Sequence, residues 1–239
     1  MSEIRFTIPS HNRADMIGSH TLKFFPEAIV CVAESQRDDY RKVSNNLLLH
    51  PDTLKGIGPK RQWMLDNIDS EVVVMIDDDM KNFISIVGMK YRSYRDPADV
   101  KAIVARTALC AAEAGASLFG FHQTADVRKF IPHKPFNLCT WFGGAIGFIG
   151  RKFKYDSFLR SRGEDVDYSL QTLLKDRFVW GDNRYGFIFR RWDTKGGNSA
   201  NRERGQQLEE IRYLKRKWGK FLEVQQRETC ERLIIRVTR

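Results

Sequence analysis

Apolar runs alternate with segments of helical periodicity through the first half of the chain. Residues 72–76 are five consecutive apolar residues, mostly β-branched, and acids follow them directly. Such a run predicts a strand that is buried on both faces. Shorter apolar runs predict strands at 4–10 and 28–34, and residues 56–68 have the spacing of a helix. This alternation indicates βαβ units, and therefore an α/β protein with a three-layer α/β/α sandwich and a mostly parallel central sheet.

The second half of the chain alternates less regularly. An alanine-rich segment at 96–115 begins with an aspartate and ends with a glycine, which is typical of an amphipathic helix. A helical period recurs at 164–176, and a basic amphipathic helix is expected at 206–223. The strands expected here are 117–123, a glycine-broken 142–150, 177–182 and 185–192. No repeat or linker divides the chain, so we predict one domain over 1–200, with 201–239 as a basic helix and tail packed on it.

Three consecutive aspartates at 77–79 follow the strongest predicted strand. In parallel sheets, ligands bind at the carboxyl ends of the strands, which here are expected at 9–15, 34–38 and 77–79. Adjacent carboxylates repel one another, and Mg²⁺ and Mn²⁺ prefer carboxylate oxygens, so a divalent-metal site is the favoured interpretation. The alternative is a cap cluster for a helix that begins at Met80.

A second acidic group begins the helix predicted at 164–176 and follows the glycine-rich segment at 142–150. Glycines let the backbone approach a ligand closely, and a carboxylate beside that approach can take a proton from an attacking hydroxyl. The pKa of this base would have to be raised by burial or by neighbouring acids, and Glu164 and Asp167 are available. Alternatively, these acids serve only the helix dipole.

Charge and composition restrict the class of protein. The 239 residues carry a net charge of +10, and 15 Lys and Arg stand against 8 Asp and Glu from Gly181 onward. This balance favours a polyanion as partner, either nucleic acid or an anionic membrane, although many basic proteins bind neither. No apolar run approaches the ~20 residues of a membrane span, and the start lacks a signal-peptide pattern, so a cytoplasmic protein is expected. Cys31 and Cys110 are expected to be buried thiols, and no spacing predicts a zinc site.

The order of the motifs resembles that of glycosyltransferases with the GT-A fold. More narrowly, it is similar to the small phage-encoded, TET-associated glycosyltransferases that decorate hydroxymethylated pyrimidines, such as hydroxymethylcytosine, in DNA. The resemblance spans roughly residues 4–200 and rests on IPSHNRAD, GPKRQWMLDN, VVVMIDDDM, FGGAIGFIG and GEDVDYSLQTL. It implies a Rossmann-like GT-A fold, a nucleotide-sugar donor such as a UDP-sugar, a divalent metal (Mn²⁺ or Mg²⁺), DNA as acceptor, and the host cytoplasm as location.

The resemblance also implies a role for each matching position. Asp77 and Asp79 would form the D-x-D motif that binds metal and the donor diphosphate. Asp165, next to Glu164, would be the acid that acts as the base in inverting members. Glu34, which ends an apolar strand, either reaches the nucleotide base or is an exposed acid. The positions implied in donor binding are Pro9, Ser10, Asn12, Arg13, Glu34, Lys60, Arg61, Asp77, Asp78, Gly143, Gly144 and Lys195.

The residues support part of this set and depart from the family at one point. Lys60 and Arg61 follow glycines at a predicted helix start, which suits an anion, or else they belong to an ordinary solvated turn. Many GT-A enzymes have a late histidine as a further metal ligand, but no histidine follows His133. The polar loop at 193–198 is expected to serve that region, with Lys195 neutralising the leaving diphosphate.

The acceptor is predicted less directly. DNA would suit the basic final helix because Lys and Arg neutralise phosphates, and a target base would have to be flipped or met in a single strand. The basic residues of that helix are Arg212, Lys215, Arg216, Lys217 and Lys220. The aromatic residues that would either stack on the base or belong to the core are Trp141, Phe142 and Trp180. Two alternatives stay open: a GT-A enzyme that glycosylates a surface polysaccharide or other glycan, and a non-catalytic nucleic-acid-binding protein.

Overall fold

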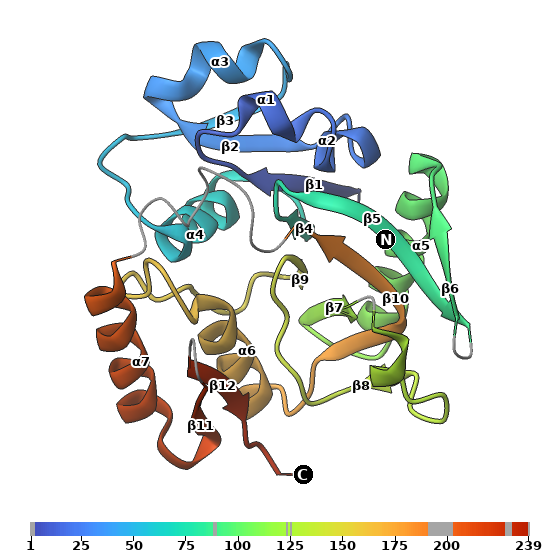
Figure 1. The fold of residues 1–239 in the computed structure, drawn as a ribbon, viewed down its shortest axis with the longest axis vertical. Coiled ribbons are helices and arrows are strands. Elements are labelled where there is room, and N and C mark those ends of the chain that lie inside the picture. Colours follow the sequence, from blue (N-terminus) through green and yellow to red (C-terminus); the bar gives the residue numbers. More distant parts are fainter. Residues whose placement is uncertain are drawn as a thin grey trace.

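The fold is organised around one large sheet (Figure 1). The computed structural model describes residues 3–87, 90–122, 124, 126–190, 203–227 and 231–238. The strands of this sheet are β1 (Ile4–Pro9), β2 (Ile29–Ala33), β3 (Leu47–His50), β4 (Val72–Ile76), β5 (Met80–Val87), β6 (Lys90–Tyr94), β7 (Leu118–His122), β8 (Phe136–Asn137), β9 (Ala145–Ile149) and β10 (Trp180–Phe189). Their order is β3-β2-β1-β4-β9-β7-β10-β5-β6, and β8 pairs with β10.

The first four strands form a parallel block. β1 pairs in parallel with β2 and β4, and β2 pairs in parallel with β3. Their carboxyl ends therefore meet at one edge, which brings the segments after Pro9, Ala33 and Ile76 to the same side of the sheet. In the other half, β7 and β10 are parallel and the remaining pairings are antiparallel. The strands predicted at 4–10, 28–34 and 72–76 are confirmed, whereas β3 was not predicted.

Helices cover both faces of the sheet. β4 shows the two faces most clearly because its residues alternate between two core clusters. Val74 belongs to the same cluster as Val104 of α5 (Pro97–Glu113). Met75 belongs to the cluster of Met64 in α4 (Ile57–Asn67) and Leu173 in α6 (Glu164–Lys175). Burying each such side chain, rather than leaving it exposed, stabilises the folded state by about 1.5–3 kcal/mol. The predicted three-layer α/β/α arrangement and all three of these helices are confirmed.

The predicted pair of late strands is a single strand, β10. Its register against β7 shifts between Asp182 and Gly186. At this irregularity the Asp182 carboxylate accepts hydrogen bonds from the Arg184 backbone N–H (3.1 Å) and guanidinium (2.8 Å). Asn183 and Arg184, which separate the two predicted strands, are therefore accommodated inside β10.

Three short helices connect the parallel strands. They are α1 (Ala14–Ile17), α2 (Thr21–Phe24) and α3 (Arg37–Arg41). The sequence predicts a helix or turn closed by Phe24, Phe25 and Pro26, which α2 confirms. α1 and α3 lack a recognisable period because each has only four or five residues.

The C-terminal segment differs from the predicted long helix. α7 (Arg204–Trp218) ends at Gly219, whose φ of 51° is left-handed. An antiparallel hairpin of β11 (Leu222–Gln226) and β12 (Glu231–Ile235) follows, so the predicted continuation of the helix to residue 223 is wrong. Leu214 and Leu233 share a buried cluster with Leu170 of α6.

No helix in the described ranges has the length and apolar character to cross a bilayer. Cys31 is buried and unpaired, as predicted, whereas the free thiols of Cys110 and Cys139 are half-buried. Cys230 lies outside the described residues.

Candidate active site

The three aspartates form the turn between β4 and β5. A strand begins at Met80, so the alternative in which these acids cap a helix is wrong. The Thr21 hydroxyl holds the turn, because it donates to the Asp77 carbonyl (2.7 Å) and accepts from the Met80 N–H (3.1 Å). The side chains of Asp77, Asp78 and Asp79 are 38%, 5% and 15% exposed. The outer two carboxylates thus retain access to solvent, and the middle one is buried.

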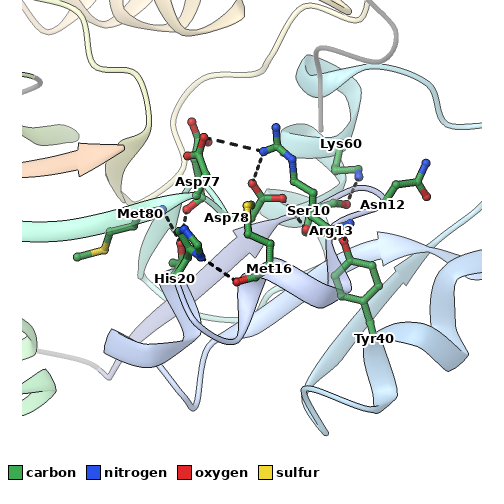
Figure 2. Close-up of polar contacts among 12 residues, drawn as sticks. Ser10, Asn12, Arg13, Met16, His20, Tyr40, Lys60, Asp77, Asp78 and Met80 are labelled. Carbon is green, nitrogen blue, oxygen red and sulfur yellow. Dashed lines mark hydrogen bonds and ion pairs between the residues drawn. The ribbon is translucent and has the colours of Figure 1, made fainter. Parts of the chain in front are cut away.

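Asp78 connects this turn to the loop after β1 (Figure 2). Its carboxylate accepts hydrogen bonds from the Ser10 hydroxyl (2.6 Å) and the Arg13 guanidinium (2.6 Å). The Tyr40 hydroxyl lies 2.6 Å from that of Ser10 and accepts from the Arg13 backbone N–H (3.0 Å). Burial raises the pKa of Asp78, while Arg13 and Ser10 oppose the rise. These contacts of Asp78 are internal, and its predicted contact with the donor stays a prediction.

Asp77 and Asp79 are the two partly exposed carboxylates of the turn, and they were predicted to bind a metal. Burial and the neighbouring carboxylates of Asp77 and Asp78 raise the pKa of Asp79 to about 7. The Arg13 guanidinium, 4.0 Å from the Asp79 carboxylate, opposes this rise. A dication would offset this repulsion, and carboxylate oxygens suit Mg²⁺ and Mn²⁺. In the described part of the chain, no three His, Cys, Asp or Glu side chains form a ready metal site. The two aspartates thus supply the oxygen donors that suit a divalent cation.

Arg61 joins the two acidic motifs. Its guanidinium donates to the Asp77 carboxylate (3.0 Å) and to the Glu164 carboxylate (3.1 Å). The Arg61 and Glu164 side chains are 5% and 8% exposed, so their contact forms away from solvent, where an unpaired charge is costly, whereas Asp77 is partly exposed. One residue of α4 thereby fixes the end of β4 relative to the start of α6.

Glu164 and Asp165 begin α6 after Gly163. The φ of Gly163 is 80°, in the left-handed region that glycine adopts without strain. Glu164 is buried, whereas Asp165 is half-buried and accepts from the Val166 N–H (2.8 Å). Burial raises the pKa of both carboxyls, and the Arg61 charge opposes the rise. A further contribution to the raised pKa of Asp165 comes from Asp77. The raised pKa that a general base needs is thus present at Asp165.

Lys60 and Gly144 tie two more segments to this site. The buried Lys60 ammonium donates to the Ser10 carbonyl (2.7 Å), and burial lowers its pKa. The Gly144 carbonyl accepts from the Asp77 N–H (2.7 Å). A Cβ at Gly144 would lie 2.6 Å from the Phe189 ring, so glycine permits this close approach. Gly143 is buried next to it.

Other predicted positions lie at the margin. Pro9 is buried at the end of β1, and Asn12 is exposed with a left-handed φ of 54°. Glu34 is exposed in the 3-10 turn after β2, and among the described residues it forms no hydrogen bond or ion pair with the acidic motifs. Lys195 and the rest of the loop at 193–198 lie outside the described residues.

The aromatic candidates and the basic helix are partly used inside the protein. Phe142 is buried in the core cluster beneath α4 and α6, and Trp141 and Trp180 pack partly buried against core clusters. Lys215 donates to two backbone carbonyls, and Lys217 pairs with Asp156 and Asp167. Within the described part of the chain, no hydrogen bond or ion pair is made by the exposed side chains of Arg212, Arg216 and Lys220.

Sequence reasoning missed Thr21 and Tyr40. The Thr21 hydroxyl orders the acidic turn, and the Tyr40 hydroxyl orders the loop after β1. Neither belongs to a motif, and the spacing of apolar residues cannot reveal a hydroxyl that acts through a contact distant in sequence.

A family model described as TET-Associated Glycosyltransferase matches residues 4–197. No curated protein sequence matches the chain significantly.

Two solved structures illustrate the similarity in fold. S. aureus TarS 1-349 in complex with UDP-GlcNAc is 13% identical, with a TM-score of 0.52, over 84% of this chain and 61% of that chain. This chain thus spans less than two thirds of the TarS structure. Glucosyl-3-phosphoglycerate synthase from Mycobacterium tuberculosis, with Mn²⁺, UDP and phosphoglyceric acid, is 13% identical with a TM-score of 0.56, over 98% of this chain and 86% of that chain. The predicted GT-A fold is confirmed.

Proposed function

The chain belongs to the TET-associated glycosyltransferase family, and we propose that it moves a sugar from a UDP-sugar to DNA. The acceptor is a hydroxyl on a hydroxymethylated pyrimidine of phage DNA, or on a sugar already attached to that base. The observation that carries this proposal is the bridge from Arg61 to Asp77 and Glu164, because it unites the acids of both motifs in one cluster. One motif then serves the donor diphosphate and the other serves the acceptor hydroxyl.

The donor side is assigned to the turn after β4. Asp77 and Asp79 would hold Mn²⁺ or Mg²⁺, and a bound dication stabilises the charge of a departing diphosphate. The TarS structure contains UDP-GlcNAc, and the mycobacterial synthase was also determined with Mn²⁺ and UDP-glucose, which makes UDP-sugars and Mn²⁺ the first to test. Ser10, Arg13 and Lys60 act mainly through the protein, since their contacts order the loop on which the nucleotide would rest.

The acceptor side is assigned to Asp165. The acceptor oxygen attacks the anomeric carbon, the bond from that carbon to the diphosphate breaks, and the hydroxyl proton passes to the Asp165 carboxylate. Burial keeps the pKa of this carboxyl raised, so it is a stronger base than an exposed aspartate. Arg61 lies between the motifs and holds Glu164 beside the base.

DNA as acceptor is supported by the family name and by exposed basic residues on α7. Arg212 and Arg216 lie on the exposed side of this helix, and Lys220 follows it. Phosphate neutralisation by such residues would make the affinity for DNA fall steeply with salt. Lys215 and Lys217 have internal partners and are assigned to the packing of α7 instead.

The proposal is tested by release of nucleoside diphosphate from a panel of nucleotide-sugars. Each donor is incubated with Mn²⁺ or with EDTA, in the presence or absence of hydroxymethylcytosine DNA. We expect metal-dependent release from a UDP-sugar that this DNA stimulates. Release that DNA does not stimulate would contradict the acceptor and favour another glycan. Salt-sensitive DNA binding without release from any donor would contradict the whole proposal.

A further inference from the structure

A carboxylate of the C-terminal helix holds the turn that leads into α6. Glu210 of α7 accepts hydrogen bonds from the backbone N–H groups of Arg160 (2.9 Å) and Ser161 (3.1 Å). Its second oxygen accepts from the Ser161 hydroxyl (2.6 Å). Three residues after Ser161 stand Glu164 and then Asp165, so this contact fixes the backbone immediately before both acids.

The burial of Glu210 is unusual for a charged residue. It is 0% exposed, and a buried carboxylate is costly unless hydrogen bonds satisfy it. Its hydrogen-bond partners in the described ranges are neutral: two backbone N–H groups, one hydroxyl and the amide of Gln206 (2.9 Å). Both carboxyl oxygens are thereby satisfied, so Glu210 holds the turn at two consecutive residues.

The same turn also touches α4, which carries Arg61. The Arg160 carbonyl accepts from the Ile57 N–H (2.8 Å) at the start of that helix. Residues 160 and 161 therefore stand between Glu210 on one side and α4 on the other. A shift of the turn would move Glu164 and Asp165 relative to Arg61 and the aspartates after β4.

Further contacts from the C-terminal segment converge on this stretch. Arg162 pairs with Glu231 of β12 (3.3 Å). A Cβ on Gly163 would lie 2.4 Å from Leu214, which shows how closely α7 packs there. On α6 itself, the buried Asp167 accepts from the Trp218 indole N–H (2.8 Å).

We propose that Glu210 is a positioning residue for transfer, which sets the place of Glu164 and Asp165 through the 160–163 turn. The inference rests on the proposed function only in taking Asp165 as the base. It also assigns a catalytic purpose to a segment beyond residues 4–197, the part that the family model matches. Through Glu210, α7 thus contributes to the active site by ordering the protein, separately from the contact with DNA that is proposed for its exposed arginines.

The test compares Glu210→Ala, Glu210→Gln and the control Glu209→Gln in the full chain. Glu209 is the exposed neighbour of Glu210 on α7. We expect Glu210→Ala to lower kcat by about 10- to 100-fold with little change in donor KM, because small displacements of catalytic groups are costly. Glutamine keeps one oxygen for the two backbone N–H groups and can donate to the Ser161 hydroxyl, so it should retain most of kcat. The control should match the parent protein.

Hydrogen exchange separates failure of this inference from failure of the proposed function. Glu210→Ala should speed amide exchange in a peptide covering 157–166, whether or not a substrate is known. A parent protein without transferase activity would contradict the proposed function. Faster exchange in the Glu210→Ala variant would still support the role of Glu210 in holding the 160–163 turn. A folded Glu210→Ala variant with unchanged kcat, or unchanged exchange, would overturn the inference. If that variant does not fold, Ser161→Ala replaces it: a loss in kcat of about three- to tenfold is expected for one hydrogen bond, and no loss would overturn the inference.

Discussion

At the scale of single residues, three adjacent aspartates differ because each meets different neighbours. Asp78 is buried against Ser10 and Arg13, whereas Asp77 and Asp79 remain partly exposed. The sequence could predict the acidic turn and the family positions, but not which carboxylate points inward. It could not predict Glu210 either, because a lone glutamate on a helix carries no sign of the distant backbone that it holds.

Asp165 is predicted to carry the proton transfer. Asp165→Asn removes the basic oxygen but preserves size and the acceptor for the Val166 N–H, so the fold should be retained. We expect kcat to fall by about 10²–10⁴-fold, the usual contribution of a general base. Steady-state kinetics and calorimetric donor binding would measure this. Unchanged turnover would remove Asp165 from the mechanism.

His50 is predicted to make stability depend on pH. It is 2% exposed, its Nδ1 lies 3.0 Å from the Pro51 carbonyl, and its buried Nε2 has no hydrogen-bond partner among the described residues. Burial lowers the pKa of His50 to about 4 in the folded protein. Between about pH 6.5, where an unfolded histidine titrates, and pH 4, the unfolded chain therefore binds a proton that the folded protein does not. The free energy of unfolding should therefore decrease between about pH 6.5 and pH 4, by at most about 3 kcal/mol.

Urea unfolding at a series of pH values would measure the His50 contribution. His50→Gln should flatten the pH dependence over this interval, whereas His133→Gln, at an exposed histidine, should keep it. Equal slopes for the His50→Gln variant and the parent protein would contradict the assignment.

At the scale of elements, long periodic segments were predictable and short ones were not. The helices at 97–113 and 164–175 match their predictions because each buries a repeated apolar face. The helix at 57–67 also matches, although it buries Lys60 and Arg61 beside Met64 and Leu65. β3 has only four residues, and the hairpin after α7 continues a basic segment whose apolar residues also fit a helical period. A 3-10 turn at Gly219–Phe221 separates these two elements, and its positive-φ Gly219 is a weak signal in sequence.

Gly58 is predicted to be essential for the packing of α4. A Cβ there would lie 2.3 Å from the Leu159 backbone carbonyl, which cannot move without shifting the turn before α6. Gly58→Ala should therefore destabilise the protein by about 1–3 kcal/mol, although alanine favours a helix. Thermal unfolding would measure this loss.

Gly205→Ala in α7 is the matched control for Gly58→Ala. Nothing lies within 4 Å of a Cβ at that position, so the helix preference of alanine should leave stability equal or higher. Equal stability of the Gly58→Ala variant and the parent would show that α4 can withdraw from the turn.

At the scale of the whole molecule, the site is assembled from segments far apart in sequence. The parallel strands bring the loop after β1 and the acidic turn together, and Ser10 bonds to Asp78 there. Arg61 connects the acidic turn to the start of α6. Glu210 of α7 holds the turn that precedes α6. Hydrophobic alternation could predict the sheet and its ligand edge. It could not predict that the basic C-terminal segment packs on α6, because that contact depends on the buried Leu214 and Leu233 in elements of different type.

Sugar transfer to DNA is tested most directly by the masses of nucleosides digested from hydroxymethylcytosine DNA. The DNA is incubated with the protein, Mn²⁺ and a panel of UDP-sugars, in parallel with the Asp165→Asn variant. We expect a new nucleoside, heavier by one sugar, that requires the nucleotide-sugar and is absent with the variant. Unmodified nucleosides with every donor that the protein binds, or equal modification by the variant, would contradict this expectation.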